Sequence, residues 1–187
     1  MNKTALHWLG RSLAVAAAAL SVGCANDAPL SPARRPALDR AADLPAGCEK
    51  LQAPAGSTLA FHAYASGAQI YRWDGGSWVF VAPAATLFAD EGGSGTVGTH
   101  YAGPTWESNS GSTVVGAVAN RCTPDANAIP WLSLDAVPGD GPGIFHETKF
   151  IQRLNTVGGK APTTPGSVPG EVKEVPYTAE YFFYQVP

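Results

Sequence analysis

Three histidines are the side chains in this sequence best suited to metal or acid–base chemistry. They are His62, His100 and His146, and the fourth histidine lies in the N-terminal segment. Three imidazoles can bind a metal ion and leave an open position for an activated water. No HxH or HExxH spacing occurs, so these side chains would have to meet through folding. They define one functional alternative, a metal-assisted enzyme, against the simpler explanation of isolated histidines with ordinary hydrogen bonds.

Other catalytic motifs lack either their residues or their structural context. No GxSxG nucleophile motif is present. Residues 93–98 (GSGTVG) spell GxGxxG, but a dinucleotide site needs a helix that begins at these glycines. Residues 99–104 favour a strand and a turn instead, and no acidic residue lies about 20 residues further on. We therefore expect no dissociable cofactor, and we favour a protein without catalytic activity.

A Gly-Pro corner gathers four residues that suit ligand binding. His100 and Tyr101 precede this corner, and Trp106 and Glu107 follow it. Aromatic rings supply apolar contact area and a nearby carboxylate fixes orientation, which suits a carbohydrate or another small molecule. Packing in the core of a small β domain is the competing explanation for the rings. The favoured function is a ligand- or surface-binding module around these four residues.

Alternation of apolar and polar residues predicts that strands position these side chains. From about Leu51 onward, short alternating runs are separated by Gly, Pro, Asn and Asp, which is typical of an all-β domain. We predict about nine or ten strands in an antiparallel β-sandwich or flattened barrel. The predicted strands include 96–101 and 105–108, and the segments 57–73, 77–89 and 171–186 are each predicted to hold two strands. Residues 181–186 (YFFYQV) are apolar on both faces and predict a central strand. The alternation also predicts that His62 and His100 point away from the core.

The N-terminus has the features of a lipoprotein signal peptide over residues 1–23. Lys3 and Arg11 supply positive charge, and the apolar run between Arg11 and Ser21 is shorter than the roughly 20 residues that span a bilayer. Residues 20–24 (LSVGC) resemble a lipobox, with Ser21 where leucine is usual. Cys24 is the predicted lipidation site, and conventional cleavage nearby is the alternative. Residues 24–50 are then a flexible tether, and residues 51–187 form a single β domain.

Cysteine use and charge define the expected compartment and partners. With Cys24 lipidated, Cys48 and Cys122 are expected to form a disulfide in an oxidising envelope, with free thiols or a thiolate metal site as alternatives. Outside the signal peptide, ten Lys and Arg stand against fifteen Asp and Glu, so nucleic acid is not an expected partner. The membrane is contacted through the covalent lipid on Cys24. The expected location is extracytoplasmic, on the bacterial envelope, and on the outer membrane if the host is Gram-negative.

Five segments in order along the chain carry a resemblance to a known family. They are residues 69–72 (QIYR), 98–107 (GTHYAGPTWE), 129–132 (IPWL), 151–162 (IQRLNTVGGKAP) and 175–184 (VPYTAEYFFY). Together they resemble the family named domain of unknown function 3455, found in secreted bacterial and fungal proteins. The resemblance extends over about residues 54–184 and implies an extracytoplasmic domain without an established activity. It implies no bridge between Cys48 and Cys122, because family members often carry cysteines at other positions.

Overall fold

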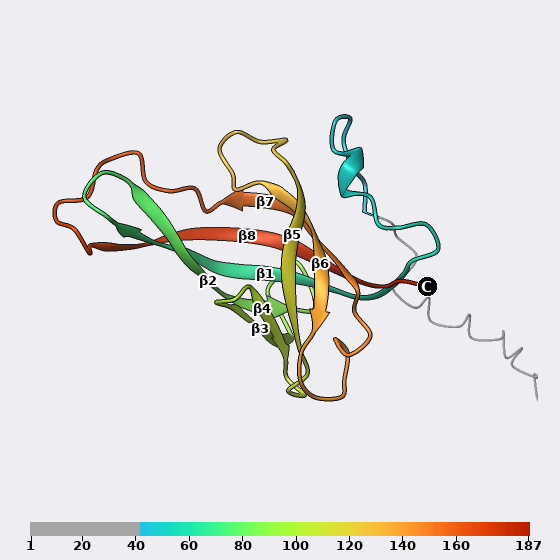
Figure 1. Ribbon diagram of the computed structural model, residues 1–187. Coiled ribbons are helices and arrows are strands. Elements are labelled where there is room, and N and C mark those ends of the chain that lie inside the picture. The colour runs from blue at the N-terminus through green and yellow to red at the C-terminus, as the bar shows by residue number, and fades with distance from the viewer. Residues whose placement is uncertain (1–41) are drawn as a thin grey trace, which may run out of the picture. The chain divides into compact units, whose positions relative to one another are not determined.

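The computed structural model describes residues 42–187, so the predicted signal peptide, Cys24 and most of the predicted tether lie outside the described part. Eight antiparallel strands form one sheet, in which each strand pairs with the next and β8 pairs with β1, so the sheet closes into a barrel (Figure 1). The elements are η1 (Glu49–Leu51), β1 (Thr58–Trp73), β2 (Trp78–Phe88), β3 (Thr96–Tyr101), β4 (Thr105–Ser108), β5 (Thr113–Cys122), β6 (Trp131–Pro138), β7 (Phe150–Gly158) and β8 (Val172–Gln185). The predicted all-β architecture is confirmed. None of the described residues belongs to a helix long and apolar enough to span a membrane.

The strand count is eight instead of about nine or ten, and β1, β2 and β8 are each one long strand where the pattern indicated two. Pro83 and Pro176 interrupt the pattern, since proline cannot donate a ladder hydrogen bond. Pro83 lies near a register shift between β1 and β2. Pro176 lies beyond the last β7–β8 pair, Gly158 with Tyr177, where β7 no longer needs a donor from β8. Both strands therefore continue through their prolines.

Apolar side chains pack on both faces of the barrel wall. The interior cluster consists of Ala63, Ala65, Leu87, Trp106, Val114, Ile129, Leu132, Leu134, Phe145, Ile151, Tyr177, Ala179, Tyr181 and Phe183. The outer cluster consists of Cys48, Leu51, Leu59, Phe150, Leu154, Phe182 and Tyr184. Strand β8 supplies alternate residues to both clusters, and it pairs with β1 on one side and β7 on the other. The apolar C-terminal run is thus explained by a strand that is covered on both faces.

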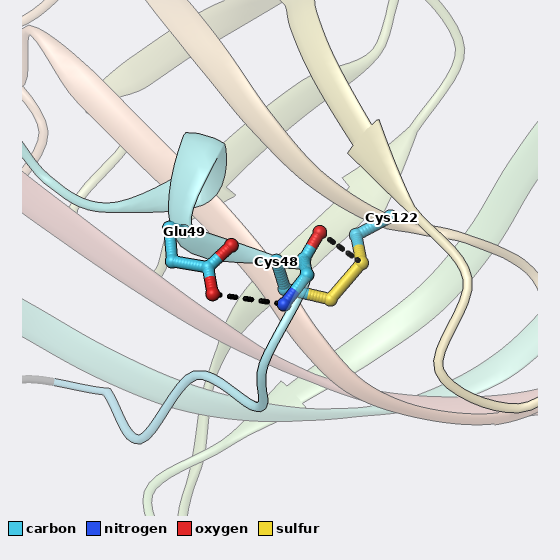
Figure 2. Close-up of a disulfide and its surroundings, with 4 residues drawn as sticks. Cys48, Glu49 and Cys122 are labelled. Atoms are coloured by element: carbon cyan, nitrogen blue, oxygen red, sulfur yellow. Dashed lines mark hydrogen bonds between the residues drawn. A yellow bond between two sulfur atoms is a disulfide. The ribbon is translucent and has the colours of Figure 1, made fainter.

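Residues 42–53 cover the outer cluster and are fixed there by a disulfide. Cys48 bonds to Cys122 at the end of β5, with 5.5 Å between their Cα atoms (Figure 2). Leu51 is fully buried, and its carbonyl accepts a hydrogen bond of 2.6 Å from Gln152 Nε2. The packed part of the chain therefore begins before Leu51, earlier than the predicted start of the domain. The predicted disulfide is present.

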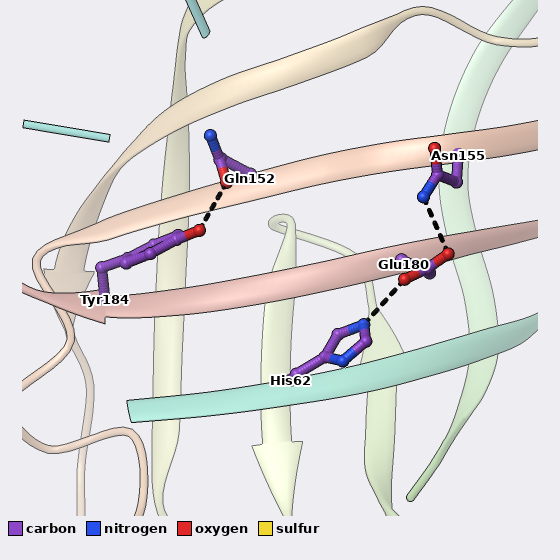
Figure 3. Close-up of polar contacts among 5 residues, drawn as sticks. All are labelled: His62, Gln152, Asn155, Glu180 and Tyr184. Carbon is purple, nitrogen blue, oxygen red and sulfur yellow. Dashed lines mark hydrogen bonds and ion pairs between the residues drawn. The ribbon is translucent and has the colours of Figure 1, made fainter. Parts of the chain in front are cut away.

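Polar contacts occupy the outer face of β1, β7 and β8 beside this cluster (Figure 3). Glu180 accepts hydrogen bonds from His62 Nε2 at 2.9 Å and from Asn155 Nδ2 at 2.8 Å. The His62 hydrogen bond lowers the pKa of Glu180 against the opposing effect of partial burial, with a smaller contribution from Asn155. The His62 ring also stacks on Phe182 with 4.2 Å between centroids. His62 therefore packs and bonds on the outer face of the barrel wall.

Candidate ligand-binding cavity

The β3–β4 hairpin carries the four predicted ligand-binding residues and divides them between the two faces of the wall. Side chains alternate along a strand, and the register pairs His100 with Trp106. These two side chains face the interior, where they are 2% and 1% exposed. Tyr101 and Glu107 lie on the outer face, where Tyr101 Oη donates to Glu107 Oε2 at 2.9 Å. The four residues therefore do not form one surface.

His100 is a neutral imidazole with a defined tautomer. Its ring stacks on Trp106 with 4.3 Å between centroids. Nδ1 lies 2.8 Å from the carbonyl oxygen of Thr105, and because a carbonyl can only accept, Nδ1 carries the proton. Burial lowers the pKa of His100 to about 3, although the Thr105 hydrogen bond opposes this effect. In the neutral ring, Nε2 is therefore an unprotonated acceptor.

The expectation that His100 points away from the core is wrong. It assumed a regular alternation in which Val97 and Tyr101 face inward. The β2–β3 register shifts where Phe88 pairs with Thr96, so Val97 is an extra residue on β3. This bulge reverses the alternation and turns His100 into the interior.

A cavity of about 330 Å³ lies in the barrel interior beside His100 and Trp106. Its lining is formed by Gln69, Tyr71, Phe80, Pro83, His100, Pro104, Trp106, Val118, Arg121, Ile129, Pro130, Leu132, Leu134, Arg153 and Tyr181. Strands β3 and β4 are the two shortest strands of the barrel, and Pro104 in the turn between them lines the cavity. The lining residues Phe80 and Val118 are 50% and 42% exposed and mark the mouth. The volume lies at the lower end of the range for small-molecule sites.

Several buried polar atoms at this end of the interior have no hydrogen-bond partner within the described chain. They are Gln69 Nε2, Trp106 Nε1, Tyr177 Oη and Tyr181 Oη. The polar ends of Gln69, Arg153 and the two tyrosines lie close enough to affect the tyrosine pKa values, although no pair meets the geometry of a hydrogen bond. Burial is the main effect and raises the pKa of both tyrosines. A buried polar group without a partner costs about 1–3 kcal/mol, and a ligand that bonded to these atoms would offset that cost.

Two arginines give the cavity positive charge without an acidic counterpart. Arg153 extends from β7, and its Nε and Nη2 donate to the carbonyl of Pro130 at 3.2 and 2.8 Å. Arg121 is exposed and also lines the cavity. No Asp or Glu is among the lining residues, and neither arginine forms an ion pair within residues 42–187. The cavity therefore combines apolar walls with positive charge.

The structure does not bring together the three histidines of the metal-assisted alternative. His62 lies on the outer face with Glu180, His100 lies in the interior, and His146 is exposed with Nε2 3.3 Å from Glu147 Oε1. In the described part of the chain, no group of three or more His, Cys, Asp and Glu side chains is arranged to hold a metal ion. No observation therefore favours metal-assisted catalysis.

The fold and the cavity define a closed antiparallel barrel with a partly polar, positively charged interior. The chain belongs to the family described as a protein of unknown function (DUF3455), which matches residues 54–185. The predicted family membership is confirmed, and the match covers all eight strands. No curated protein and no solved structure matches the chain. The cavity is therefore the basis for inferring a function.

Sequence reasoning missed the polar cavity residues Gln69, Arg153 and Tyr181. Arg153 offered the clearest signal, because it lies two residues after Ile151 and therefore on the same, inward face of β7. Arginine is rarely placed on an apolar face unless it has a partner. An inward arginine beside the buried Ile151 indicates a polar interior site.

Proposed function

We propose that the protein is a non-catalytic binding module that holds a small molecule inside the barrel cavity. The observation that carries this proposal is the set of buried, unpartnered polar atoms beside an otherwise aromatic and apolar wall. Small-molecule sites combine such walls with a few polar groups that fix the orientation of the ligand. His100 and Trp106 are wall residues in this proposal. Tyr101 and Glu107 brace the same hairpin from outside through their hydrogen bond.

We also propose that a lipid on Cys24 tethers the barrel to the bacterial envelope. The basic and apolar segments before Cys24 support this assignment, and the Cys48–Cys122 disulfide fits an oxidising compartment. Replacing Cys24 with serine is expected to move the protein from the membrane fraction to the soluble fraction, because the acyl chains supply the membrane affinity. Fractionation of cells that express Cys24→Ser measures this change. Unchanged membrane association of the variant would contradict the anchor.

The binding function can be tested with a cavity probe inside the protein. The indole N–H resonance of Trp106, assigned with Trp106→Phe, reports on the cavity in a ¹⁵N NMR spectrum. The compounds are benzoate, phenylacetate, 3-phenylpropionate and the primary amide of each. At least one compound is expected to shift the Trp106 resonance in a saturable manner. If no compound shifts the Trp106 resonance, the proposed function is contradicted.

A matched pair of valine variants locates the binding at the mouth. Val118 on β5 lines the cavity, whereas Val137 on the neighbouring strand β6 is 56% exposed and lies outside the lining. Val118→Trp fills the mouth and is expected to weaken binding by about tenfold or more, equivalent to about 1.4 kcal/mol. Val137→Trp adds the same bulk elsewhere and is expected to leave the affinity unchanged. Equal affinities of the two variants would place the bound compound outside the cavity.

A further inference from the structure

Arg153 is held in a way that leaves part of its guanidinium available to a ligand. Two of its nitrogens, Nε and Nη2, donate to the single carbonyl of Pro130. The hydrogen bonds to Pro130 leave Nη1 unused, and the guanidinium lines the cavity near Tyr181, close enough to oppose the effect of burial, which raises the pKa of that tyrosine. A guanidinium that is already fixed by protein contacts loses little freedom when it forms further hydrogen bonds. Arg153 is therefore a preorganised donor in the cavity wall.

The positive charge of Arg153 is not neutralised by its surroundings. The titratable groups around it are Tyr71, Tyr177, Tyr181 and His100, and burial favours the neutral form of each. No carboxylate lines the cavity. Arg153 is half-buried, and a charge that is partly removed from water is costly unless it is paired. An anion bound beside Arg153 would supply the missing partner.

The other unpartnered groups also favour a ligand rich in acceptors. Gln69 Nε2 and Trp106 Nε1 can only donate, and both are buried. The hydroxyl groups of Tyr177 and Tyr181 can donate or accept. His100 Nε2 is the one acceptor that the hydrogen-bond pattern assigns in this group. A carboxylate accepts hydrogen bonds at both of its oxygens and complements this excess of donors.

From this arrangement we propose that the cavity binds a small monocarboxylate with an apolar, ring-bearing body, and that Arg153 holds the carboxylate. The inference rests on the proposed function and specifies its ligand. A single negative charge matches the one arginine inside the barrel, since Arg121 is exposed. The stacked rings of His100 and Trp106, with Leu132 and Leu134, supply a flat apolar wall. The cavity of about 330 Å³ suits a one-ring molecule better than a polymer.

The experiment compares each acid named above with its own amide, which has the same shape and no charge. Wild-type protein is expected to bind the best acid about tenfold or more tightly than its amide, because a hydrogen bond to a charged group is stronger than a neutral one. This preference should fall to about one in Arg153→Gln and be intermediate in Arg153→Lys, which keeps the charge and loses the planar fork. Arg72→Gln is the control, because Arg72 is exposed and lies outside the cavity lining, so its loss should leave the preference in place.

Each outcome has a separate meaning. Equal affinity of wild-type protein for acid and amide would overturn the carboxylate assignment and leave the proposed function intact. An acid preference that persists in a folded Arg153→Gln, or that disappears equally in Arg72→Gln, would overturn the role of Arg153. Failure of every compound to bind would overturn the proposed function and this inference with it. The comparison in wild-type protein needs no variant, so misfolding of Arg153→Gln leaves the charge test valid.

Discussion

Loss of the Cys48–Cys122 disulfide is expected to lower the free energy of unfolding by about 4 kcal/mol. The bonded residues are 74 positions apart, and a cross-link over such a loop restricts the unfolded chain by about this amount in the chain-entropy model. The bond also holds residues 42–53 over the outer cluster, where Cys48 and Leu51 are buried. For a urea m-value of about 2 kcal/mol/M, the unfolding midpoint should fall by about 2 M.

Urea unfolding of reduced wild-type protein and of Cys48→Ala/Cys122→Ala measures this effect. Equal midpoints of the two samples would show that the loss of stability comes from the missing cross-link. The variant also removes the sulfur atoms, whereas reduction leaves them in place. The m-value should rise in both, since an unfolded chain without the cross-link exposes more surface. Leu51→Ala with the bond intact measures the packing of the segment alone. Equal midpoints for oxidised and reduced wild-type protein would contradict the prediction.

The architecture could be predicted because alternation and turn residues are local properties of the chain. The predicted strands at 96–101 and 105–108 agree with β3 and β4 at both ends. The apolar run at 181–186 also predicted its place in the sheet, because a strand covered on both faces needs apolar residues at consecutive positions. These features depend on neighbouring residues, which the sequence displays directly.

The inward and outward assignment failed where a neighbouring strand shifts the register. A shift between Leu59 and Phe61 places Leu59 in the outer cluster and Phe61 against the interior. The bulge at Val97 has the same effect on His100. A shift of one residue exchanges the two faces of a strand, and the alternation within a single strand does not reveal where its partner shifts. The cavity could not be predicted for this reason, because residues of all eight strands line it together.

Acidification from pH 7 to pH 4 is expected to lower the free energy of unfolding by about 3 kcal/mol through His100 alone. The imidazole has an ordinary pKa of 6.5, and burial lowers the pKa in the folded protein to about 3. Between these values the unfolded chain binds a proton that the folded protein excludes, so stability falls as the pH falls. One such proton changes the free energy by about 1.4 kcal/mol per pH unit. The contribution is fully present above pH 6.5 and is progressively lost toward pH 3.

His100→Asn isolates this contribution, because the asparagine amide can still donate to the Thr105 carbonyl and does not titrate. Protonation of carboxylates with lowered pKa values, including Glu180, also destabilises the folded protein in acid. Both proteins contain these carboxylates, so their contribution cancels in the difference. The loss of unfolding free energy between pH 7 and pH 4 should therefore be about 3 kcal/mol smaller in the variant than in wild-type protein. His146→Asn removes an exposed histidine and measures the effect of substitution outside the cavity. If wild-type protein and His100→Asn lose the same stability in acid, His100 is not a buried neutral base, and the acceptor assigned to Nε2 in the cavity is also wrong.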